Sequence, residues 1–276
     1  MIKYYTRACN FNYGFSARQL IKKKKALPLC GNKNISFSKI EVFTRNKSKI
    51  LSKKISLKKI NSLSTKQRKK IIKDLKKITR KRKNFLKNVN FSSPSVMGIL
   101  NLTPDSFSDG GKYNTKSKSF KHISSMIKLG ADIIDVGGES TRPGSKTINP
   151  KNEWKRVKNV LKNFKKRFKN ICLSLDTRKS EVMLKGIKYN LDLINDVSGF
   201  KYDTNALSKI KKYDISKVLH HMQGTPDNMQ DNPKYKNVLL DIYDFFENNI
   251  KKLNNNKIIL DPGIGFGKTL KHNLTL

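Results

Sequence analysis

The feature that most constrains this 276-residue chain is a repeated alternation of short apolar runs and amphipathic stretches after Pro94. Short β-branched runs predict strands, and the longer segments between them show the apolar spacing of helices. We expect strands near residues 96–102, 131–136, 171–176, 191–196, 216–221 and 257–261. We expect helices near residues 116–129, 152–168, 178–189, 204–212 and 236–253. This alternation is typical of βα units built around a parallel sheet.

Each predicted strand ends in polar residues, which gather at the catalytic face in a βα barrel. We therefore predict an α/β fold of the TIM (β/α)8 barrel type. An open doubly wound sheet is disfavoured, because no glycine-rich phosphate-binding turn follows the first strand. Only six such units precede Leu276, whereas a complete barrel needs about 250 residues. The expectation is an incomplete barrel domain over residues 95–276.

Residues 1–94 have a different character. They contain 28 Lys and Arg residues against Glu41 and Asp74 alone, and they show no alternation of strands and helices. One basic helix is predicted within residues 65–85, and such a helix is expected to pack on the neighbouring domain. Its apolar stripe comprises Ile71, Ile72, Leu75 and Ile78. We expect a basic N-terminal extension of unknown role that ends in a linker at 91–94.

The formal net charge of the whole chain is +40. An excess of cations can bind a phosphate backbone, but the abundance of Asn and Ile beside Lys favours a compositional bias. Nucleic-acid binding by the extension is therefore not expected. No apolar run approaches the roughly 18–20 residues that cross a bilayer, so no membrane association is expected. Three widely spaced cysteines predict neither disulfides nor a zinc site. We expect a cytoplasmic protein, with an organelle transit peptide as the alternative.

Polar residues at the expected strand ends are the candidates for chemistry. Asn101 offers an amide oxygen suited to a hard cation such as Mg²⁺. Asp176 and Asp261 each end an apolar run, as does Asn195, and a carboxylate in such a place is costly to bury unless its charge is paired. Helix capping is the alternative role for one such residue, but it accounts poorly for all of them.

Two further segments are informative. Arg142 presents a planar fork of N–H donors that suits a phosphate or carboxylate, and the hydroxyl of Thr141 can donate to a phosphate oxygen. An exposed loop with a solvated arginine is the alternative. The pair His220-His221 does not have a metal-ligand spacing, and we interpret it as structural.

Together these segments resemble dihydropteroate synthases, a family of folate-pathway enzymes. The resemblance rests on residues 97–111 (MGILNLTPDSFSDGG), residues 132–144 (DIIDVGGESTRPG) and four later segments in the family's order, at 173–177, 194–199, 220–226 and 260–269. It covers roughly residues 96–270. It implies a transferase that joins p-aminobenzoate to 6-hydroxymethyl-7,8-dihydropterin diphosphate and releases pyrophosphate. The partners it implies are these small-molecule substrates and a second copy of the chain in a homodimer.

The resemblance implies a role for each matching residue. Asn101 would bind Mg²⁺ and the substrate diphosphate, and a first loop with Asp105, Ser106 and Asp109 would fold over the site. Asp176 and Arg142 would be catalytic. The residues that would bind substrate are Thr141, Arg142, Pro143, Asp176, Asn195, Met222, Asp261, Phe266 and Lys268.

The sequence also departs from the family's pattern. A Ser-Arg-Lys motif after the seventh strand and an Arg-Val-His segment after the eighth are expected, and neither occurs in residues 1–276. We therefore expect this chain to be truncated and catalytically inactive. Two alternatives stay open, a pterin-binding methyltransferase barrel and an inactive fragment with an RNA-binding extension. Thr141 and Arg142 argue against the methyltransferase, because a methyl donor carries no diphosphate.

Overall fold

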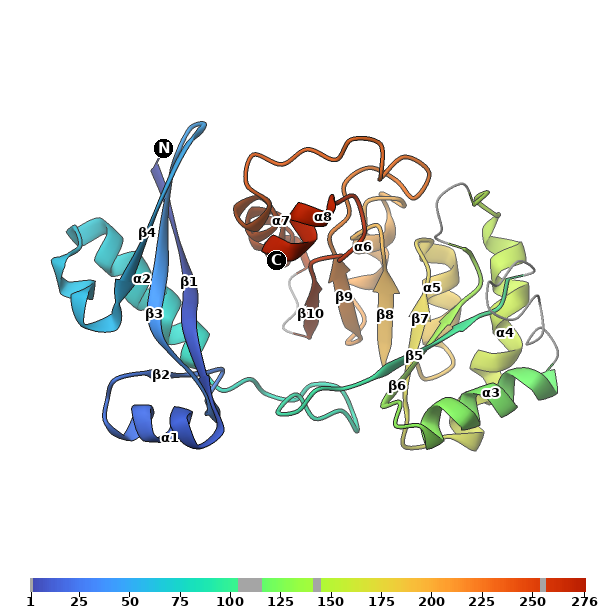
Figure 1. Cartoon of the computed structure of the whole chain (residues 1–276). Coiled ribbons are helices and arrows are strands. Elements are labelled where there is room, and N and C mark those ends of the chain that lie inside the picture. Colours follow the sequence, from blue (N-terminus) through green and yellow to red (C-terminus); the bar gives the residue numbers. More distant parts are fainter. Residues whose placement is uncertain (1, 104–115, 141–144, 254–256) are drawn as a thin grey trace. The chain divides into compact units, whose positions relative to one another are not determined.

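The computed structural model describes residues 2–103, 116–140, 145–253 and 257–276. The chain divides into two compact units, Met1–Lys83 and Asn84–Leu276 (Figure 1). The predicted site residues Asp105, Ser106 and Asp109, and residues 141–143, lie outside the described residues.

The first unit is an antiparallel sheet with helices. Its strands are β1 (Ile2–Tyr13), β2 (Leu27–Leu29), β3 (Asn32–Asn46) and β4 (Lys49–Ser56). The long strand β3 pairs with β1 along one edge and with β2 and β4 along the other. The helical elements are α1 (Gly14–Lys22), η1 (Leu57–Ser62) and α2 (Thr65–Thr79). The expectation that residues 1–94 lack alternating strands and helices is therefore wrong.

The strand signal of this unit is weak because few of its residues are buried. Of the eight residues of β4, only Ile55 is buried, so this cationic strand shows no long apolar run. Helix α2 does form where a helix was expected, but it packs on the sheet of its own unit. Ile71 is fully buried there against Phe37 and Ile40, whereas Ile72 from the expected stripe is 43% exposed.

The second unit contains a six-stranded parallel sheet. Its strands, in spatial as well as chain order, are β5 (Met97–Asn101), β6 (Ile133–Gly137), β7 (Cys172–Asp176), β8 (Leu193–Asp196), β9 (Ser216–His220) and β10 (Ile258–Asp261). The helices are α3 (Lys116–Lys128), α4 (Pro150–Arg167), α5 (Ser180–Ile187), α6 (Ala206–Ile210), α7 (Val238–Leu253) and α8 (Leu270–Thr275). The prediction of an α/β fold with parallel strands is confirmed. Among the described residues the sheet is not closed into a barrel.

Alternation along the strands gives the sheet two different faces. Ile134, Val136 and Leu173 point toward the helices and form a core with Val157 and Phe164 of α4. The opposite face changes character along each strand. Near the amino ends it is apolar, and near the carboxyl ends it carries polar residues such as Asp135 and Asp176.

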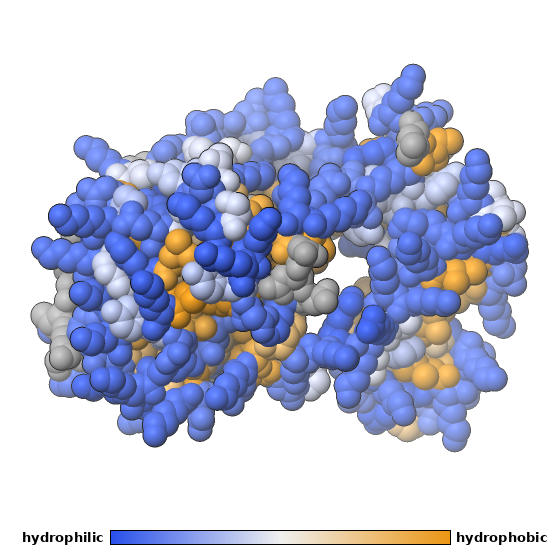
Figure 2. All heavy atoms as spheres, turned by 180° about the vertical axis from the view of Figure 1, so that it is seen from behind, coloured by the Kyte–Doolittle hydropathy of each residue, from blue (hydrophilic) through white to orange (hydrophobic). Residues whose placement is uncertain are grey.

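The apolar amino end of this inner face is covered by residues that were expected to precede the domain. Leu86 and Val89 are buried against Ile133, Cys172 and Leu193. Polar residues dominate the surface in Figure 2, in keeping with the Lys-rich composition. No helix in the described parts of the chain has both the length and the apolar character needed to cross a membrane.

Candidate active site

The strand register brings the expected polar residues to one edge of the sheet. Asn101 on β5 is paired with Gly137 on β6, and Gly137 is paired with Asp176 on β7. Asp176 is in turn paired with Asn195 on β8. Paired residues of neighbouring strands point to the same face, so these side chains share the carboxyl end of the inner face.

Gly137 makes room for the oxygen atoms on either side of it. A Cβ atom at this position would lie 3.3 Å from Oδ1 of Asn101 and 3.5 Å from Oδ2 of Asp176. The two oxygen atoms therefore converge above a backbone position that has no side chain. Both are hard oxygen donors of the kind that Mg²⁺ accepts.

Asp135 is a member of this site that the sequence reasoning did not identify. Its side chain is buried, and its Oδ2 accepts a hydrogen bond of 2.8 Å from Nδ2 of Asn195. Its Oδ1 has no hydrogen-bond partner among the described residues. Burial raises the pKa of Asp135, although the side chains of Ser174 and Asn195 oppose the shift. An acidic residue inside an otherwise buried strand, two positions before Gly137, was the signal available in the sequence.

Asp176 completes the group that we call the inner-edge cluster, comprising Asn101, Asp135, Asp176 and Asn195. Burial and the negative charges of Asp135 and Asp196 raise the pKa of Asp176 well above its ordinary value. No cationic side chain in the described parts of the chain forms an ion pair with Asp135 or Asp176. Two neighbouring carboxyl groups without a cation provide a place where N–H donors of a ligand would be favourable.

Asp196, the next residue after Asn195, has a structural role. One of its carboxylate oxygens accepts bonds from the backbone N–H and the hydroxyl of Ser198, at 2.8 and 2.6 Å. The other accepts the N–H of Phe200 at 3.2 Å. Burial nevertheless raises the pKa of Asp196 to about 6. Asp196 therefore fixes the turn that follows β8.

A second group of predicted residues lies after β9 and β10. Lys268 is 3% exposed, and its Nζ donates to the carbonyl oxygen of Phe266 at 2.9 Å. The same Nζ lies 3.2 Å from Nδ1 of His221. Burial lowers the pKa of Lys268 to about 8, against the opposing charge of Asp261. The carboxylate of Asp261 accepts the N–H of Gly263 at 2.8 Å, which makes it a turn cap in this structure.

The remaining predicted residues are placed by packing. The ring of Phe266 meets that of His220 edge to face, with centroids 4.7 Å apart. Met222 is buried. His220 contacts the carbonyl oxygen of Val197 through Nδ1 at 2.7 Å, and His221 packs against Phe245. These contacts give both histidines structural partners.

A metal site made wholly of side chains is not found. No group of three or more His, Cys, Asp or Glu residues in the described parts of the chain could hold a metal ion. Mg²⁺, however, commonly keeps several waters and binds through one or two protein oxygens together with substrate phosphates. The side-chain oxygen of Asn101 at this edge of the sheet fits that mode of binding and not an all-protein cage.

The fold and this site agree with the known proteins that the chain resembles. A family model described as pterin binding enzyme matches residues 97–276. Dihydropteroate synthase of Escherichia coli (strain K12) is 42% identical over 194 residues, with 68% of each chain covered. The enzyme of Clostridium beijerinckii is 46% identical over 184 residues, with 65% of each chain covered.

Solved structures give the same result. Dihydropteroate synthase of Yersinia pestis with a sulfonamide drug complex has a TM-score of 0.65 at 42% identity, over 68% of this chain and 70% of that one. The Xanthomonas albilineans enzyme with 4-aminobenzoic acid has a TM-score of 0.60 at 34% identity, with 68% of each chain covered. The parallel-sheet unit thus has the fold of the pterin-binding enzymes.

Within that class, the chain belongs to the dihydropteroate synthases, transferases of folate biosynthesis. The resemblance stated from the motifs is confirmed. The relatives named above are all dihydropteroate synthases, so the methyltransferase alternative gains no support.

Proposed function

We propose that the inner-edge cluster binds the pterin ring of 6-hydroxymethyl-7,8-dihydropterin diphosphate, to which p-aminobenzoate is then joined. The observation that carries the proposal is the pair Asp135 and Asp176, which have no cationic partner among the described residues and have raised pKa values. A pterin presents ring and exocyclic N–H donors in one plane. Hydrogen bonds to a charged acceptor are stronger than neutral ones, so these donors would stabilise the carboxylates.

The second group, which follows β9 and β10, would contact the pterin ring as well and would border the p-aminobenzoate pocket. Asp261 has one oxygen bonded to the N–H of Gly263, which leaves acceptor capacity for a pterin N–H. Lys268 would donate to a pterin ring acceptor, and Met222 would pack against the ring. Phe266 would border the p-aminobenzoate pocket. Thr141, Arg142 and Pro143 keep their proposed contacts with the diphosphate and with p-aminobenzoate, as inferred from the sequence.

The reaction needs positioning and charge stabilisation, but no covalent nucleophile. The amine nitrogen of p-aminobenzoate forms a bond to the exocyclic methylene carbon, and the bond from that carbon to the diphosphate oxygen breaks. Pyrophosphate leaves with the electron pair, and the nitrogen loses one proton. The carboxylates of Asp135 and Asp176 would hold the pterin in line and tolerate positive charge on its methylene carbon.

Asn101 would be the protein ligand of Mg²⁺. When bound, the ion would neutralise charge on the departing pyrophosphate. The Asn101 amide would orient the diphosphate end of the substrate, since Oδ1 already lies at the same edge as Asp176. A homodimer and a cytoplasmic location stay predictions.

Titration of the intact chain with 6-hydroxymethylpterin, followed by calorimetry, tests this function. We expect binding in the parent and a loss of about tenfold or more in Asp135→Asn, because charged hydrogen bonds contribute about 1.5–3 kcal/mol. The matched control is Asp192→Asn. Asp192 pairs with Lys165 and accepts the N–H of Leu173, a residue near the amino end of β7. Equal pterin affinity in the parent and in Asp135→Asn would refute the proposed site.

A further inference from the structure

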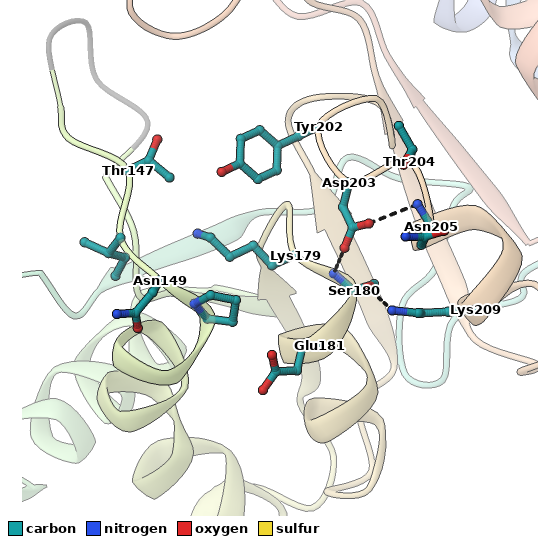
Figure 3. Close-up of a pocket in the computed structure, with 12 residues that line it drawn as sticks. Thr147, Asn149, Lys179, Ser180, Glu181, Tyr202, Asp203, Thr204, Asn205 and Lys209 are labelled. Atoms are coloured by element: carbon teal, nitrogen blue, oxygen red, sulfur yellow. Dashed lines mark hydrogen bonds between the residues drawn. The ribbon is translucent and has the colours of Figure 1, made fainter.

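Two buried lysine side chains lie in segments that follow strands of the parallel sheet, and different partners hold their ammonium groups. Lys179, after β7, is paired with carboxylates, because its Nζ lies 2.8 Å from Oε1 of Glu139 and 2.6 Å from Oε2 of Glu153. Figure 3 shows this lysine directed into a cavity of about 620 Å³. Lys268, after β10, forms no ion pair with a carboxylate in the described parts of the chain. Its amine is therefore held by uncharged acceptors.

Three acceptors surround the amine of Lys268. Its Nζ donates to the carbonyl oxygen of Phe266 at 2.9 Å, and it lies 3.2 Å from Nδ1 and 3.3 Å from the carbonyl oxygen of His221. An ammonium group has three N–H donors, so each acceptor can receive one. The contact at 3.3 Å is the longest, and it is the one that an acceptor on a pterin ring would replace most easily. The other two contacts would then keep the amine in place.

The contact with Nδ1 of His221 requires a neutral imidazole whose proton is on Nε2, since a protonated ring has no acceptor. The surroundings favour that form, because burial and the charges of Lys268 and Lys201 lower the pKa of His221 to about 3. Burial also lowers the pKa of Lys268 to about 8, against the opposing effect of Asp261. At neutral pH, Lys268 is therefore the donor and His221 the acceptor.

Aromatic neighbours fix the ring of His221. The ring of Phe245 on α7 meets it edge to face, with centroids 4.9 Å apart, and the centroid of the Tyr235 ring lies 5.9 Å from it. The backbone is fixed as well, because the N–H of His221 donates to the carbonyl oxygen of Asp261 at 2.9 Å. A ring held in this way presents Nδ1 to Lys268 in a fixed direction.

Tyr235 fixes the backbone beside the same lysine. Its hydroxyl donates to the carbonyl oxygen of Gly267, the residue before Lys268, at 2.8 Å. Gly267 has a φ of 62°, and a Cβ atom there would lie 2.6 Å from the carbonyl oxygen of Gln223. The side chain of Gln223 in turn forms two hydrogen bonds of 2.8 Å with the backbone of Lys234, next to Tyr235. The segment after β9 is therefore packed closely against the segment that carries Lys268.

We propose that His221, assisted by Tyr235, is a positioning residue that holds the amine of Lys268 where it can donate to an acceptor on the pterin ring. The inference rests on the proposed function, in which Lys268 contacts the pterin. His221 does not touch the substrate and acts through Lys268. An imidazole suits this role better than a carboxylate, because it accepts a hydrogen bond without cancelling the charge of the lysine.

The first test measures the amine of Lys268 in the intact chain without a ligand. Carbon-13 NMR of the lysine Cε atoms gives its pKa, and Lys268→Met assigns the signal. His221→Phe keeps an aromatic ring but removes the acceptor, so we expect the pKa of Lys268 to fall by about one pH unit. His221→Asn offers an acceptor near the position of Nδ1, and the pKa should then stay within about 0.3 of the parent value. Both variants keep the other ionisable groups around the amine, which are Asp261, Lys201, His220 and Tyr235.

The second test measures binding of 6-hydroxymethylpterin to the intact chain by calorimetry. We expect Kd to rise about tenfold in His221→Phe and about threefold in Tyr235→Phe, because a hydrogen bond to a charged group contributes more than a neutral one. Kd should stay within about twofold of the parent in His221→Asn and in the control Asp192→Asn. In a Lys268→Met background, neither His221→Phe nor Tyr235→Phe should cause a further loss, because the amine that they position is gone.

The outcomes separate this inference from the proposed function. A parent chain that binds no pterin would remove the proposed function. A parent that binds pterin, with the same Lys268 pKa in His221→Phe as in the parent, would overturn the role of His221 alone. Losses of affinity that add to that of Lys268→Met would also overturn it, since they would assign His221 to the fold. Tyr235→Phe removes a single hydroxyl, so it provides the same comparison if His221→Phe fails to fold.

Discussion

Two groups of buried charged residues lie side by side at the carboxyl edge of the sheet. They differ in whether their carboxylates are paired with cations. In the first group, which we call the buried quartet and which comprises Glu139, Glu153, Arg178 and Lys179, each carboxylate is paired with a cation. These cations lower the pKa of Glu139, whereas burial raises that of Glu153. In the inner-edge cluster, Asp135 and Asp176 lack such partners among the described residues, and their pKa values are raised. Asp135 and Glu139 are both acidic and are four positions apart in the chain, yet their pKa values are shifted in opposite directions.

The difference separates groups that hold the structure from groups that await a ligand. The charges of the quartet balance in the folded chain, although Oε1 of Glu153 has no hydrogen-bond partner among the described residues. Breaking such a network leaves an uncompensated charge. Carboxyl groups without cations gain most when a ligand brings N–H donors. Four experiments test this distinction, and the first should show the largest effect.

Lys179→Met should lower the free energy of unfolding by about 3–5 kcal/mol at pH 7, because Glu153 would lose its only ion-pair partner among the described residues. Urea denaturation followed by circular dichroism measures the change. The double variant Glu153→Gln/Lys179→Met should recover part of the loss, since the charges of Arg178 and Glu139 then balance. A loss below about 1 kcal/mol would show that the quartet does not stabilise the fold.

Asp176→Asn should act on binding and not on stability. We expect pterin affinity to fall about 10- to 100-fold, as the loss of charged hydrogen bonds of about 1.5–3 kcal/mol implies. The free energy of unfolding should stay equal or rise, because a carboxyl with an unfavourable charge is removed. Calorimetric titration and urea denaturation measure the two quantities. Destabilisation without a loss of affinity would assign Asp176 to the fold.

Gly137→Ala should have a smaller effect on the same site. The added Cβ would lie tightly against Oδ1 of Asn101 at 3.3 Å and in ordinary contact with Oδ2 of Asp176 at 3.5 Å. We expect about a fivefold loss of pterin affinity with a change in stability near 1 kcal/mol, as is typical of mild overpacking. Gly98→Ala is the matched control, because its Cβ would meet Met126 and not the site. Equal affinity losses in both variants would argue against the inner edge as the binding surface.

The pH dependence of stability should show the smallest effect, since Asp176 is partly exposed and solvent screens its charge. A carboxyl with a raised folded-state pKa favours folding at low pH, and that contribution is lost as pH rises through the folded pKa. The unfolding free energy of Asp176→Asn relative to the parent should therefore increase as the pH rises from about 4 to 7. A difference that shrinks with rising pH would contradict the raised pKa.

Much of the barrel-type unit could be predicted because its central strands are buried on both faces. The strands around Ile134 and Leu173 are almost wholly buried and largely apolar, as the strands of parallel sheets usually are. The first unit could not be predicted in the same way. Its strand β4 is cationic and largely exposed, so the apolar residues Ile50, Leu51 and Ile55 do not form the alternating pattern of a half-buried strand.

Within the site, the sequence by itself determined which polar residues end the strands, because strand period and order place Asn101, Asp176 and Asn195 on one edge. Only the tertiary structure showed that Asp135 joins them and that Glu139 is paired with Arg178 and Lys179. Both are acids in similar local sequence, two and six positions after Ile133. Their roles differ because one meets an amide and the other meets two cations from a different loop. Such contacts arise across the fold, so no local pattern contains them.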